Sequence, residues 1–480
     1  MPLNPDWLDA ELEQFDNDAA DLTEWWRTLE DPVLDRLIAT AYVQNNTLKI
    51  AGLRVLESQA RLGIASGNRY PQLQAAAGDA TAIGTSKSSA DSESRDLSFV
   101  QYNLGASLSW EMDFWGRFRR GVEAADAGLL ASIADYDDVL VLLTAQVADV
   151  YTIIRATEEQ LRLAQDSVDI QQRSYDIVQV LYRNGESSEL DALQAKTLLL
   201  STQTIIPNLQ ATLRQTKNTL SVLLGMAPAD IEDLLDGEGA LPHVPDTVAI
   251  GVPANLLRQR PDVRKAELQA LAQNALVGVA EANLYPSFSL NGTLGLSSTE
   301  NTTSTQSGNS GLGELFSSDS ATYAVGVSFA WPFLNYGRIR NNIRIEDARL
   351  QQALIAYRET VMQAARETEN ALTLHASTRA QDLILREGVA AAKRSADLSL
   401  LRYREGFADY QRVLNAQQSL FSQQQRYAAN RGDIVRSLIS IYRSLGGGWQ
   451  TNRQYIDEAT REQMEQRSNW GELLDNPPQQ

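Results

Sequence analysis

The sequence predicts a mainly α-helical protein that also supplies strands to a membrane β-barrel, and three features of its 480 residues lead to this fold class. Long stretches without proline favour uninterrupted helices with a coiled-coil repeat. Shorter segments alternate between apolar and polar residues, as strands with one buried face do. The same succession of signals occurs twice along the chain, which indicates a tandem duplication.

Long helices fit within the proline-free stretches 72–206 and 333–476. In 136–168 apolar residues recur at intervals of three and four, with Thr157 filling the single gap, and this spacing predicts a coiled-coil seam. A helix from Gly116 to Gly185 would be about 100 Å long at 1.5 Å per residue, so we expect an elongated fold. The seam residues are Leu140, Leu143, Val147, Val150, Ile154, Leu161, Ala164 and Val168.

Matching residues recur at two nearly equal offsets. An offset of 215 relates Tyr70-Pro71 to Tyr285-Pro286, and an offset of 221 relates Gly116-Arg117 to Gly337-Arg338. The second copy therefore has six extra residues in its strand region. Further matches at 221 are Tyr182-Arg183-Asn184-Gly185 with Tyr403-Arg404-Glu405-Gly406, and Leu224-Gly225 with Leu445-Gly446.

Each copy contains two candidate strands. The first copy has a weakly alternating segment after Pro71 and a strictly alternating one in 100–114, and the second copy has alternating segments in 287–297 and 322–331. The polar stretches 84–96 and 297–311 are predicted to be hairpin loops. The apolar strand faces can pack on the core of a soluble sandwich or face lipid. Four strands cannot close a membrane barrel, so the second alternative requires several chains in a ring.

The residues that flank the strands favour the membrane. Aromatic side chains gather at the helix-side ends of the strands, as in the girdles of membrane barrels, and arginines follow at once. Cations are unfavourable in the first turn of a helix, so we expect lipid headgroup phosphates to hold them. The predicted membrane-interface rim consists of Trp110, Trp115, Arg117, Trp331, Tyr336 and Arg338.

Composition excludes several classes of function. The formal net charge of −19 argues against a nucleic-acid partner, because such proteins need a basic face for phosphates. The chain has no cysteine, so neither a disulfide framework nor a thiolate metal site can form. No run of about 18 consecutive apolar residues occurs, which on this criterion excludes a transmembrane helix.

Four motifs resemble the TolC-type outer-membrane efflux channels, specifically their OprM/NodT branch, over roughly residues 30–450. They are WEMDFWGRFRRG (110–121), RPDVRKAE (260–267) with GVAEANLYPSFSLNGTLG (278–295), YAVGVSFAWPFLNYGRIR (323–340) and YRSLGGGW (442–449). The resemblance implies a homotrimer with a 12-stranded barrel in the outer membrane of a Gram-negative bacterium and an α-barrel in the periplasm. It further implies an exit duct that serves an inner-membrane pump and a periplasmic adaptor, contacts outer-membrane lipid and needs no cofactor.

Members of this branch commonly begin with a lipid-modified cysteine. This chain begins MPLNPDW, without that cysteine and without the pattern of a signal peptide. We expect either that the chain is a trimmed mature form or that the barrel alone anchors it.

The duplication and the resemblance divide the chain into eight expected parts. They are an N-terminal segment with the first helices (1–70), a first barrel hairpin (71–115), a first α-barrel hairpin (116–225), an equatorial connection (226–253), a second-repeat helix (254–285), a second barrel hairpin (286–333), a second α-barrel hairpin (334–445) and a C-terminal equatorial segment with the tail (446–480).

The turns that follow the long helices are the expected periplasmic tip. Gly185 and Gly406 are placed as left-handed cap residues. The family closes its pore with a leucine and, four residues later, an aspartate; here Gln411 and Asn415 stand at those positions, so an acidic ring is not expected. Asp191 and Arg412 are equivalent repeat positions, and in a trimer they would alternate around one ring and latch it shut. The expected adaptor contacts are Tyr182, Arg183, Gly185, Tyr403, Arg404 and Gly406.

Enzymatic functions are disfavoured. The chain has two histidines, His243 and His375, far apart in sequence, and neither a GxxxxGK[ST] loop nor an HExxH pair. Each histidine is expected to be a surface or packed residue, and no catalytic or metal-binding residue is predicted. The remaining alternative to a channel is a soluble coiled-coil scaffold or periplasmic adaptor protein, which would leave the amphipathic strands and their aromatic ends without a use.

Overall fold

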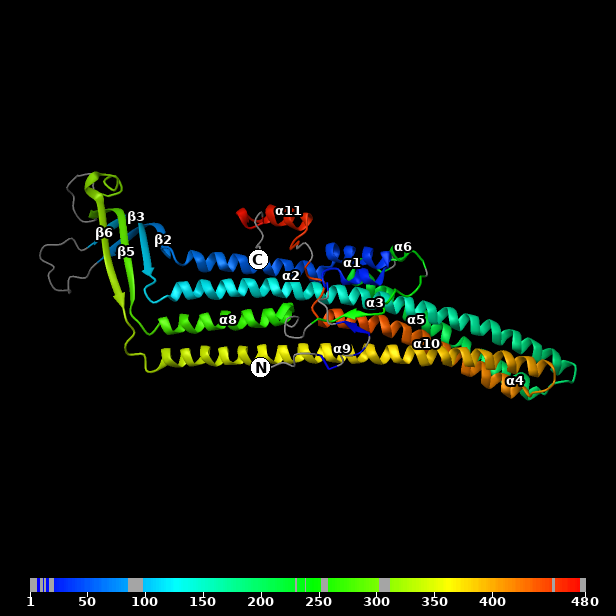
Figure 1. Ribbon diagram of the computed structural model, residues 1–480. Coiled ribbons are helices and arrows are strands. Elements are labelled where there is room, and N and C mark those ends of the chain that lie inside the picture. Colours follow the sequence, from blue (N-terminus) through cyan, green and yellow to red (C-terminus); the bar gives the residue numbers. More distant parts are fainter. Residues whose placement is uncertain are drawn as a thin grey trace. The chain divides into compact units, whose positions relative to one another are not determined.

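The computed structural model describes residues 7–8, 12, 14–16, 21–84, 98–228, 231–237, 239–251, 258–301, 311–450 and 454–474 (Figure 1). The chain divides into two compact units. Unit 1 comprises Met1–Leu56, Ser132–Ala266 and Tyr357–Gln479, and unit 2 comprises Glu57–Ala131 and Glu267–Ala356.

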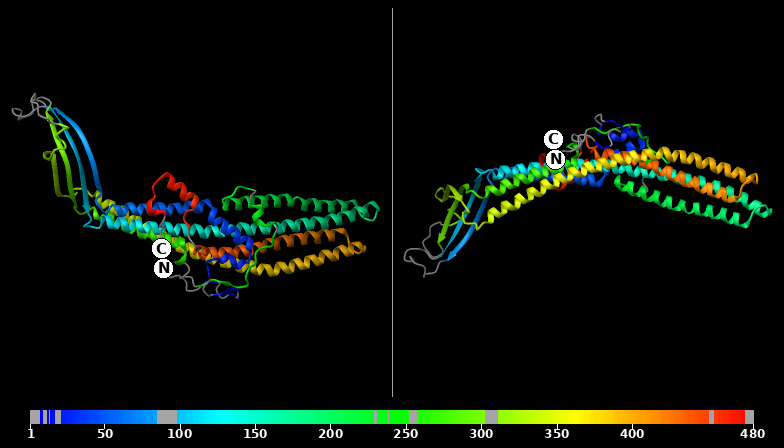
Figure 2. Two further views of the ribbon diagram at one scale, coloured as in Figure 1. Left: turned by 90° about the horizontal axis from the view of Figure 1, so that it is seen from above. Right: turned by 60° about the horizontal axis from the view of Figure 1, so that its bottom comes forward.

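Unit 2 contains one antiparallel sheet, which Figure 2 shows from two further sides. Its strands are β2 (Leu73–Gly84), β3 (Ser98–Met112), β5 (Ser287–Asn301) and β6 (Ala321–Ala330), in the order β2-β3-β5-β6. The register pairs Leu104 with Leu296 and Trp110 with Leu290, so apolar residues face apolar residues across the strands. Among the described residues, β2 and β6 each have one edge without a partner strand.

Several predicted boundaries are wrong. Gly84, expected in a loop, is the last residue of β2, and β6 covers Ala321–Ala330 rather than 322–331. The stretch 297–301, expected in a loop, belongs to β5, because β3 is long enough to pair with it and Ser297 Oγ donates to Asn103 Oδ1 at 2.9 Å. β3 ends at Met112 rather than at 114, because the Asp113 carboxylate accepts hydrogen bonds from the first turn of the next helix. Residues 85–96 and 302–310 of the predicted loops lie outside the described residues.

The longest helices are α3 (Arg117–Arg183) and α9 (Arg338–Arg404), each of 67 residues and each contributing to both units. In unit 2, α3 and α9 approach α8 (Pro261–Ala282): the Arg120 side chain lies against Gly278, and Gln273 Nε2 donates to Glu346 Oε2 at 2.7 Å. The helix α2 (Asn46–Gly67) leads into β2.

Most of the predicted seam of α3 is buried, and only Val150 and Val168 of its eight residues are half-buried. Val147, Ile154 and Ala164 have no exposed surface, and Thr157 in the gap is also buried. This helix also contains an 18-residue window with a mean hydropathy of 1.6, of which 61% is buried in the protein. The count of consecutive apolar residues misses this window because polar residues interrupt it. Core helices of water-soluble domains pass the same length and composition test, so the window is weak evidence of a membrane span.

The two return helices differ. In the first copy the chain returns through α4 (Glu189–Gln203) and α5 (Ile205–Leu223), and in the second through one helix, α10 (Tyr410–Ser444). The break at Thr204 places Pro207 in the first turn of α5, where its missing N–H is not needed. The second copy has no proline in this stretch, and α10 is continuous.

Smaller elements complete the two units. Trp25 stacks on Tyr442 with ring centroids 5.0 Å apart, which packs the 3-10 turn η1 against α10. In unit 1 these elements are η1 (Trp25–Leu29), α1 (Pro32–Gln44), α6 (Glu232–Leu235), α11 (Glu458–Arg467), η3 (Gly471–Leu473) and the parallel pair β1 (Phe15–Asp16) with β4 (Val248–Ala249); in unit 2, η2 (Ser318–Ser320) precedes β6.

The backbone repeats wherever the sequence repeats. Matched glycines adopt the same left-handed conformation: φ is 80° at both Gly116 and Gly337, 81° and 80° at Gly185 and Gly406, and 66° and 76° at Gly225 and Gly446. These angles favour glycine because a Cβ would clash with the backbone. The duplication inferred from the sequence is therefore confirmed in the fold.

A side-chain contact is duplicated as well. Asn45 Nδ2, just before α2, donates to the Leu223 carbonyl at 2.8 Å. Arg260, just before α8 and equivalent to Asn45 at the offset of 215, donates through Nη1 to the Ser444 carbonyl. Each copy thus uses one polar side chain to bind the C-terminal carbonyls of its return helix, where the helix itself supplies no donor.

Candidate functional site

The turn after each long helix is closed by its glycine. Gly185 N donates to Tyr182 O at 3.0 Å, and Gly406 N donates to Tyr403 O at 3.0 Å. A Cβ built on either glycine would meet no atom within 4 Å, so conformation rather than crowding requires glycine here. Both predicted left-handed caps are confirmed.

The turns of the two copies pack on each other around a small apolar cluster. Its buried members come from α3, α4 and α10: Val178, Ala192, Ala195, Tyr410 and Val413. The rings of Tyr403 and Tyr410 meet edge to face with centroids 5.2 Å apart, and Gln417 Nε2 donates to Ser174 Oγ at 2.7 Å in a buried position. Arg183 bonds Gln179 at 3.0 Å along its own helix.

The charged residues at the tip occupy equivalent places but have different partners. Asp191 lies in the capping box of α4, where its carboxylate accepts from Ser188 N at 3.2 Å and its N–H donates to Ser188 Oγ at 3.1 Å. Arg412 lies in the first turn of α10, and its Nε is 3.7 Å from Asp409 Oδ1. The Arg412 side chain is exposed and that of Asp191 is half-buried, and within one chain they form no pair with each other.

Gln411 and Asn415 interact within α10. Gln411 Nε2 donates to Asn415 Oδ1 at 3.0 Å on an exposed face. The structure therefore gives these two positions an uncharged pair, one helical turn apart.

The three tryptophans of the predicted rim are fixed by hydrogen bonds to the backbone. The indole Nε1 of Trp110 donates to Arg69 O at 3.2 Å, that of Trp115 to Pro286 O at 2.8 Å and that of Trp331 to Leu284 O at 3.1 Å. Each indole thus joins the end of one strand to the residues that precede another strand of the same sheet. Tyr336 is 97% exposed.

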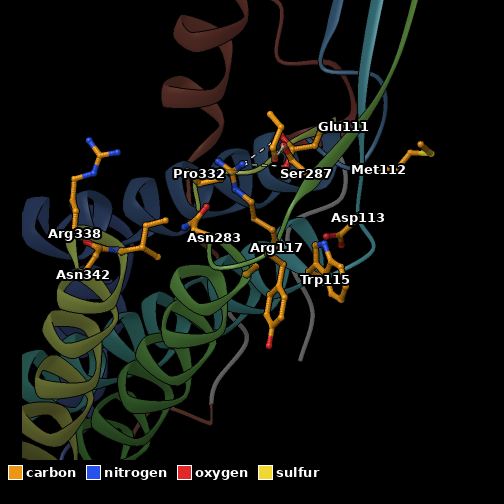
Figure 3. Close-up of a pocket in the computed structure, with 14 residues that line it drawn as sticks. Glu111, Met112, Asp113, Trp115, Arg117, Asn283, Ser287, Pro332, Arg338 and Asn342 are labelled. Carbon is orange, nitrogen blue, oxygen red and sulfur yellow. Dashed lines mark hydrogen bonds and ion pairs between the residues drawn. The ribbon is translucent and has the colours of Figure 1, made fainter. Parts of the chain in front are cut away.

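Arg117 and Arg338 differ in their surroundings although they are equivalent in the repeat. Arg117 Nη1 lies 3.2 Å from Glu111 Oε1, on the polar face of β3, so this arginine has a carboxylate partner within the protein. Arg338 has no ion pair with any carboxylate that the structure describes. Figure 3 shows both at a cavity of about 420 Å³ in unit 2, the junction pocket. It is lined by Glu111, Met112, Asp113, Trp115, Arg117, Ala282, Asn283, Tyr285, Ser287, Ala330, Pro332, Arg338, Ile339 and Asn342.

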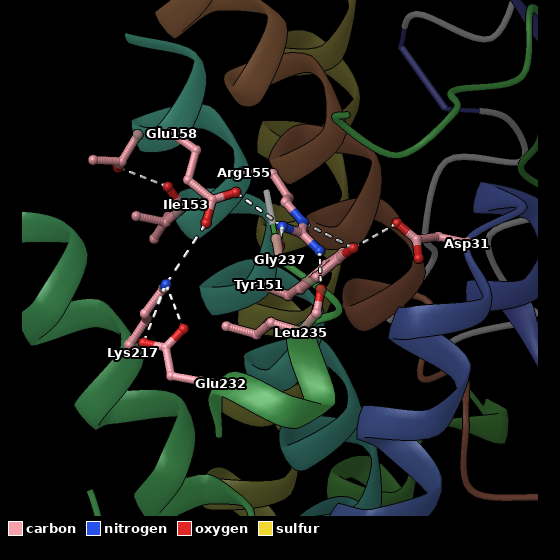
Figure 4. Close-up of polar contacts among 10 residues, drawn as sticks. Asp31, Tyr151, Ile153, Arg155, Glu158, Lys217, Glu232, Leu235 and Gly237 are labelled. Carbon is pink, nitrogen blue, oxygen red and sulfur yellow. Dashed lines mark hydrogen bonds and ion pairs between the residues drawn. The ribbon is translucent and has the colours of Figure 1, made fainter. Parts of the chain in front are cut away.

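Unit 1 contains a buried arginine, whose polar contacts are drawn in Figure 4. Arg155 is 2% exposed and donates to the carbonyls of Leu235 and Gly237, both at 2.7 Å, and to Glu158 Oε2 at 2.9 Å. Burial alone would lower the pKa of Arg155, but hydrogen bonds to Tyr151 and Glu158 raise it, so the guanidinium stays charged.

The partners of Arg155 extend the network to both sides. Tyr151 OH accepts from Arg155 Nε at 3.1 Å and donates to Asp31 Oδ2 at 2.8 Å. Lys217 Nζ lies 3.8 Å from Glu158 Oε1 and 3.1 Å from Glu232 Oε2. The network therefore ties α3, α5 and α6 together with the start of α1.

His375 is packed in unit 1 and His243 is exposed, so the expectation that each is a surface or packed residue is confirmed. The Nδ1 atom of His375 lies 2.8 Å from Ser437 Oγ, while its Nε2 has no hydrogen-bond partner among the described residues. Burial, together with the positive charge of Arg379, lowers the pKa of His375 to about 4.

This buried imidazole makes stability depend on pH. In the unfolded chain it takes up a proton near pH 6.5, but in the folded protein only near pH 4, so acid favours unfolding between these values. We expect about 3 kcal/mol of stability to be lost as the pH falls from 6.5 to 4. The H375Q variant should lack this part of the pH dependence; parallel unfolding curves for the two proteins across this range would contradict the assignment.

Among the residues that the structure describes, no three or more His, Asp or Glu side chains form a group that could hold a metal ion. Sequence reasoning missed the buried Arg155 and Arg260. An arginine on a long helix, such as Arg155, looks like part of a solvated face, and Arg260 just before α8 looks like a surface residue. The one available signal was the position of Arg155 beside the seam residue Ile154.

Comparisons with known proteins agree with this geometry. The family model of outer membrane efflux proteins matches residues 37–226 and 252–447. The chain is 30% identical over 432 residues to the pyoverdine export outer membrane protein OpmQ of Pseudomonas putida, covering 89% of this chain and 88% of that protein. It is 30% identical over 426 residues to the cation efflux system protein CusC of Escherichia coli, covering 88% of each. The solved outer-membrane channel OprN superimposes with a TM-score of 0.87 at 29% identity, covering 94% of this chain and 98% of that one.

Proposed function

We propose that three copies of this chain, which belongs to the outer membrane efflux proteins, join their sheets into one closed barrel. The barrel would form the channel in the outer membrane of a Gram-negative bacterium. The observation that carries this proposal is the sheet itself. It has four strands, whereas membrane barrels need about eight or more, and three copies would supply twelve. Because neighbours alternate in direction, β6 runs antiparallel to β2, which is the orientation needed for β6 of one copy to pair with β2 of the next.

The exposed faces of the strands support a lipid environment. On β6 the apolar side chains Tyr323, Val325, Val327 and Phe329 are 68–83% exposed. A contiguous apolar surface of this kind marks a membrane or protein contact. In the proposed barrel this face contacts lipid, the polar face lines the pore, and Trp110, Trp115, Trp331 and Tyr336 lie at the headgroup level.

The long helices supply the periplasmic part of the duct. Helices α3 and α9 are each about 100 Å long at 1.5 Å per residue, enough to extend the pore far from the membrane. We propose that a periplasmic adaptor contacts the turns around Tyr182, Arg183, Gly185, Tyr403, Arg404 and Gly406, and that an inner-membrane pump loads the duct. The relatives are named for exporting different cargoes, pyoverdine and cations among them. The duct is therefore proposed to conduct small molecules passively, with the pump choosing them.

Disulfide cross-linking tests the trimer, since the chain has no cysteine of its own. Cysteines placed at Ala77 in β2 and, in separate variants, at Thr322, Ala324 or Gly326 in β6 should cross-link different copies. We expect a ladder of covalent species that ends at three chains, and none with either cysteine alone. A ladder that stops at two, or continues past three, would overturn the proposed ring.

We further propose that Asp191 and Arg412 of neighbouring chains alternate around the tip and hold it closed. Three exposed pairs of about 0.5 kcal/mol each amount to about a tenfold change in the open population. The R412D variant is the cleaner test, because Asp191 also caps α4.

We expect R412D to raise the open probability of single channels in planar bilayers about tenfold, and high salt to do the same to the parent protein. The R426D variant, with the same change at an exposed position farther along α10, should stay as closed as the parent. Equal open probabilities of R412D and the parent would refute the latch, and a return to the parent's low open probability in D191R/R412D would support it.

A further inference from the structure

We propose that the junction pocket binds a small organic anion, whose phosphate or carboxylate group is held by Arg338. The pocket lies where three strand–helix junctions of unit 2 meet, those of β3 with α3, α8 with β5 and β6 with α9. Its volume of about 420 Å³ is in the range of small-molecule sites and exceeds the space that a bare inorganic ion needs.

In the first copy, two carboxylates neutralise the start of the long helix α3. Glu111 pairs with Arg117, with Oε1 and Nη1 3.2 Å apart. The Asp113 carboxylate accepts from Phe118 N at 3.1 Å and from Arg119 N at 2.9 Å. Two carboxylates from the end of β3 thus neutralise the arginine and satisfy the free N–H groups of α3.

The second copy keeps the positive groups and lacks both carboxylates. At the offset of 221, Pro332 and Leu334 stand where the two acids stood, while Arg338 keeps the arginine. The N–H groups of Ile339 and Arg340, equivalent to the two capped ones, have no hydrogen-bond partner among the described residues. The start of α9 therefore lacks the two carboxylates that neutralise the start of α3. An anion bound in the pocket would take the place of these carboxylates.

The pocket has a polar side and an aromatic side, and Figure 3 shows Arg338 and Asn342 on one side and Trp115 on the other. Arg338 and Asn342 lie one turn apart on α9 and both line the pocket, so a guanidinium and an amide are available to one oxyanion. Trp115 and Tyr285 also line it, stacked at 4.6 Å, and the indole is fixed by its bond to Pro286 O. The stacked rings form a rigid apolar wall for the rest of the molecule.

Two sources could supply this chemistry. In the proposed barrel, a placement that rests on the proposed function, the pocket lies at the membrane end of the helices. A phospholipid headgroup and a passing anionic solute could both reach it there. Both present a phosphate or carboxylate on a small organic body.

Calorimetric titration of glycerol 3-phosphate into the purified, lipid-depleted protein in detergent tests the site. We expect binding to the parent protein and a loss of affinity of about tenfold or more in R338Q. L334D should lose a similar factor in affinity although Arg338 is intact. It restores the carboxylate that Asp113 supplies in the first copy, and this carboxylate would compete with the anion. R344Q removes the same charge from α9 outside the pocket and should bind like the parent.

Native mass spectrometry of protein from phosphatidylglycerol nanodiscs separates the sources. If the parent protein retains a lipid that R338Q loses, and glycerol 3-phosphate does not displace this lipid, the pocket is a lipid site. If glycerol 3-phosphate displaces the lipid readily, the pocket is a site for soluble anions. Absence of binding to the parent, or equal losses in R338Q and R344Q, would overturn the site. Planar-bilayer conductance of the same samples tells the two proposals apart. If the protein forms channels but binds no anion, only the pocket is refuted. If it forms no channels, the proposed function is refuted.

Discussion

Replacing Arg155 with methionine is expected to lower the free energy of unfolding by about 3–5 kcal/mol, the usual cost of removing one partner of a buried charged network. The carbonyls of Leu235 and Gly237 lose the charged donor that Arg155 supplies, and a carbonyl buried without a donor is costly. Glu158 keeps Lys217, at 3.8 Å, as its remaining partner. The midpoint of thermal unfolding, followed by circular dichroism in detergent, measures the loss.

The matched control lies two turns further along the same helix. Arg162 forms exposed pairs with Glu159 and Asp166, and such surface pairs contribute about 0–1 kcal/mol each. R162M should therefore unfold close to the parent. If R155M and R162M shift the midpoint equally, the buried network is not what holds α6 against α3.

Replacing Gly225 with alanine is expected to destabilise the protein by about 2–5 kcal/mol. Its φ of 66° costs a non-glycine residue about 1–2 kcal/mol. A Cβ there would also lie 2.4 Å from the carbonyl oxygen of Gln44, so the turn after α5 or the end of α1 must move, at a cost of about 1–3 kcal/mol.

Gly185 separates the two causes. Its φ of 81° is equally left-handed, but a Cβ there meets no atom within 4 Å. G185A should thus cost only the conformational part, about 1–2 kcal/mol. Equal unfolding midpoints for the two variants would show that the contact with Gln44 adds nothing.

The sequence predicted those parts of the fold that follow from local periodicity. The alternation in 100–114 located β3, and the 3/4 spacing located the buried seam of α3, because one buried face leaves a direct pattern. Glycine positions marked the helix ends for a similar reason, since few other residues adopt a φ near 80°. Family membership then decides for the channel against a soluble scaffold.

Contacts between segments that are distant in the sequence leave no periodic pattern, so they could not be predicted. Arg155 and the carbonyls of Leu235 and Gly237 are about 80 residues apart, and nothing in the spacing of charged residues brings them together. The pair of Glu111 with Arg117 was missed for another reason, since six residues along the chain is not a spacing at which strand or helix residues regularly pair. The end of β5 was misplaced because Ser and Thr residues, which favour loops, here pair with a long partner strand.

Single-channel recording in planar bilayers, alongside the mass of the detergent complex, tests the central claim most directly. We predict a trimer that inserts and shows small conductances, closed most of the time, as the proposed latch between Asp191 and Arg412 requires. A water-soluble monomer or dimer that never inserts would contradict the account, since the apolar faces of β3 and β6 would then have to pack against protein.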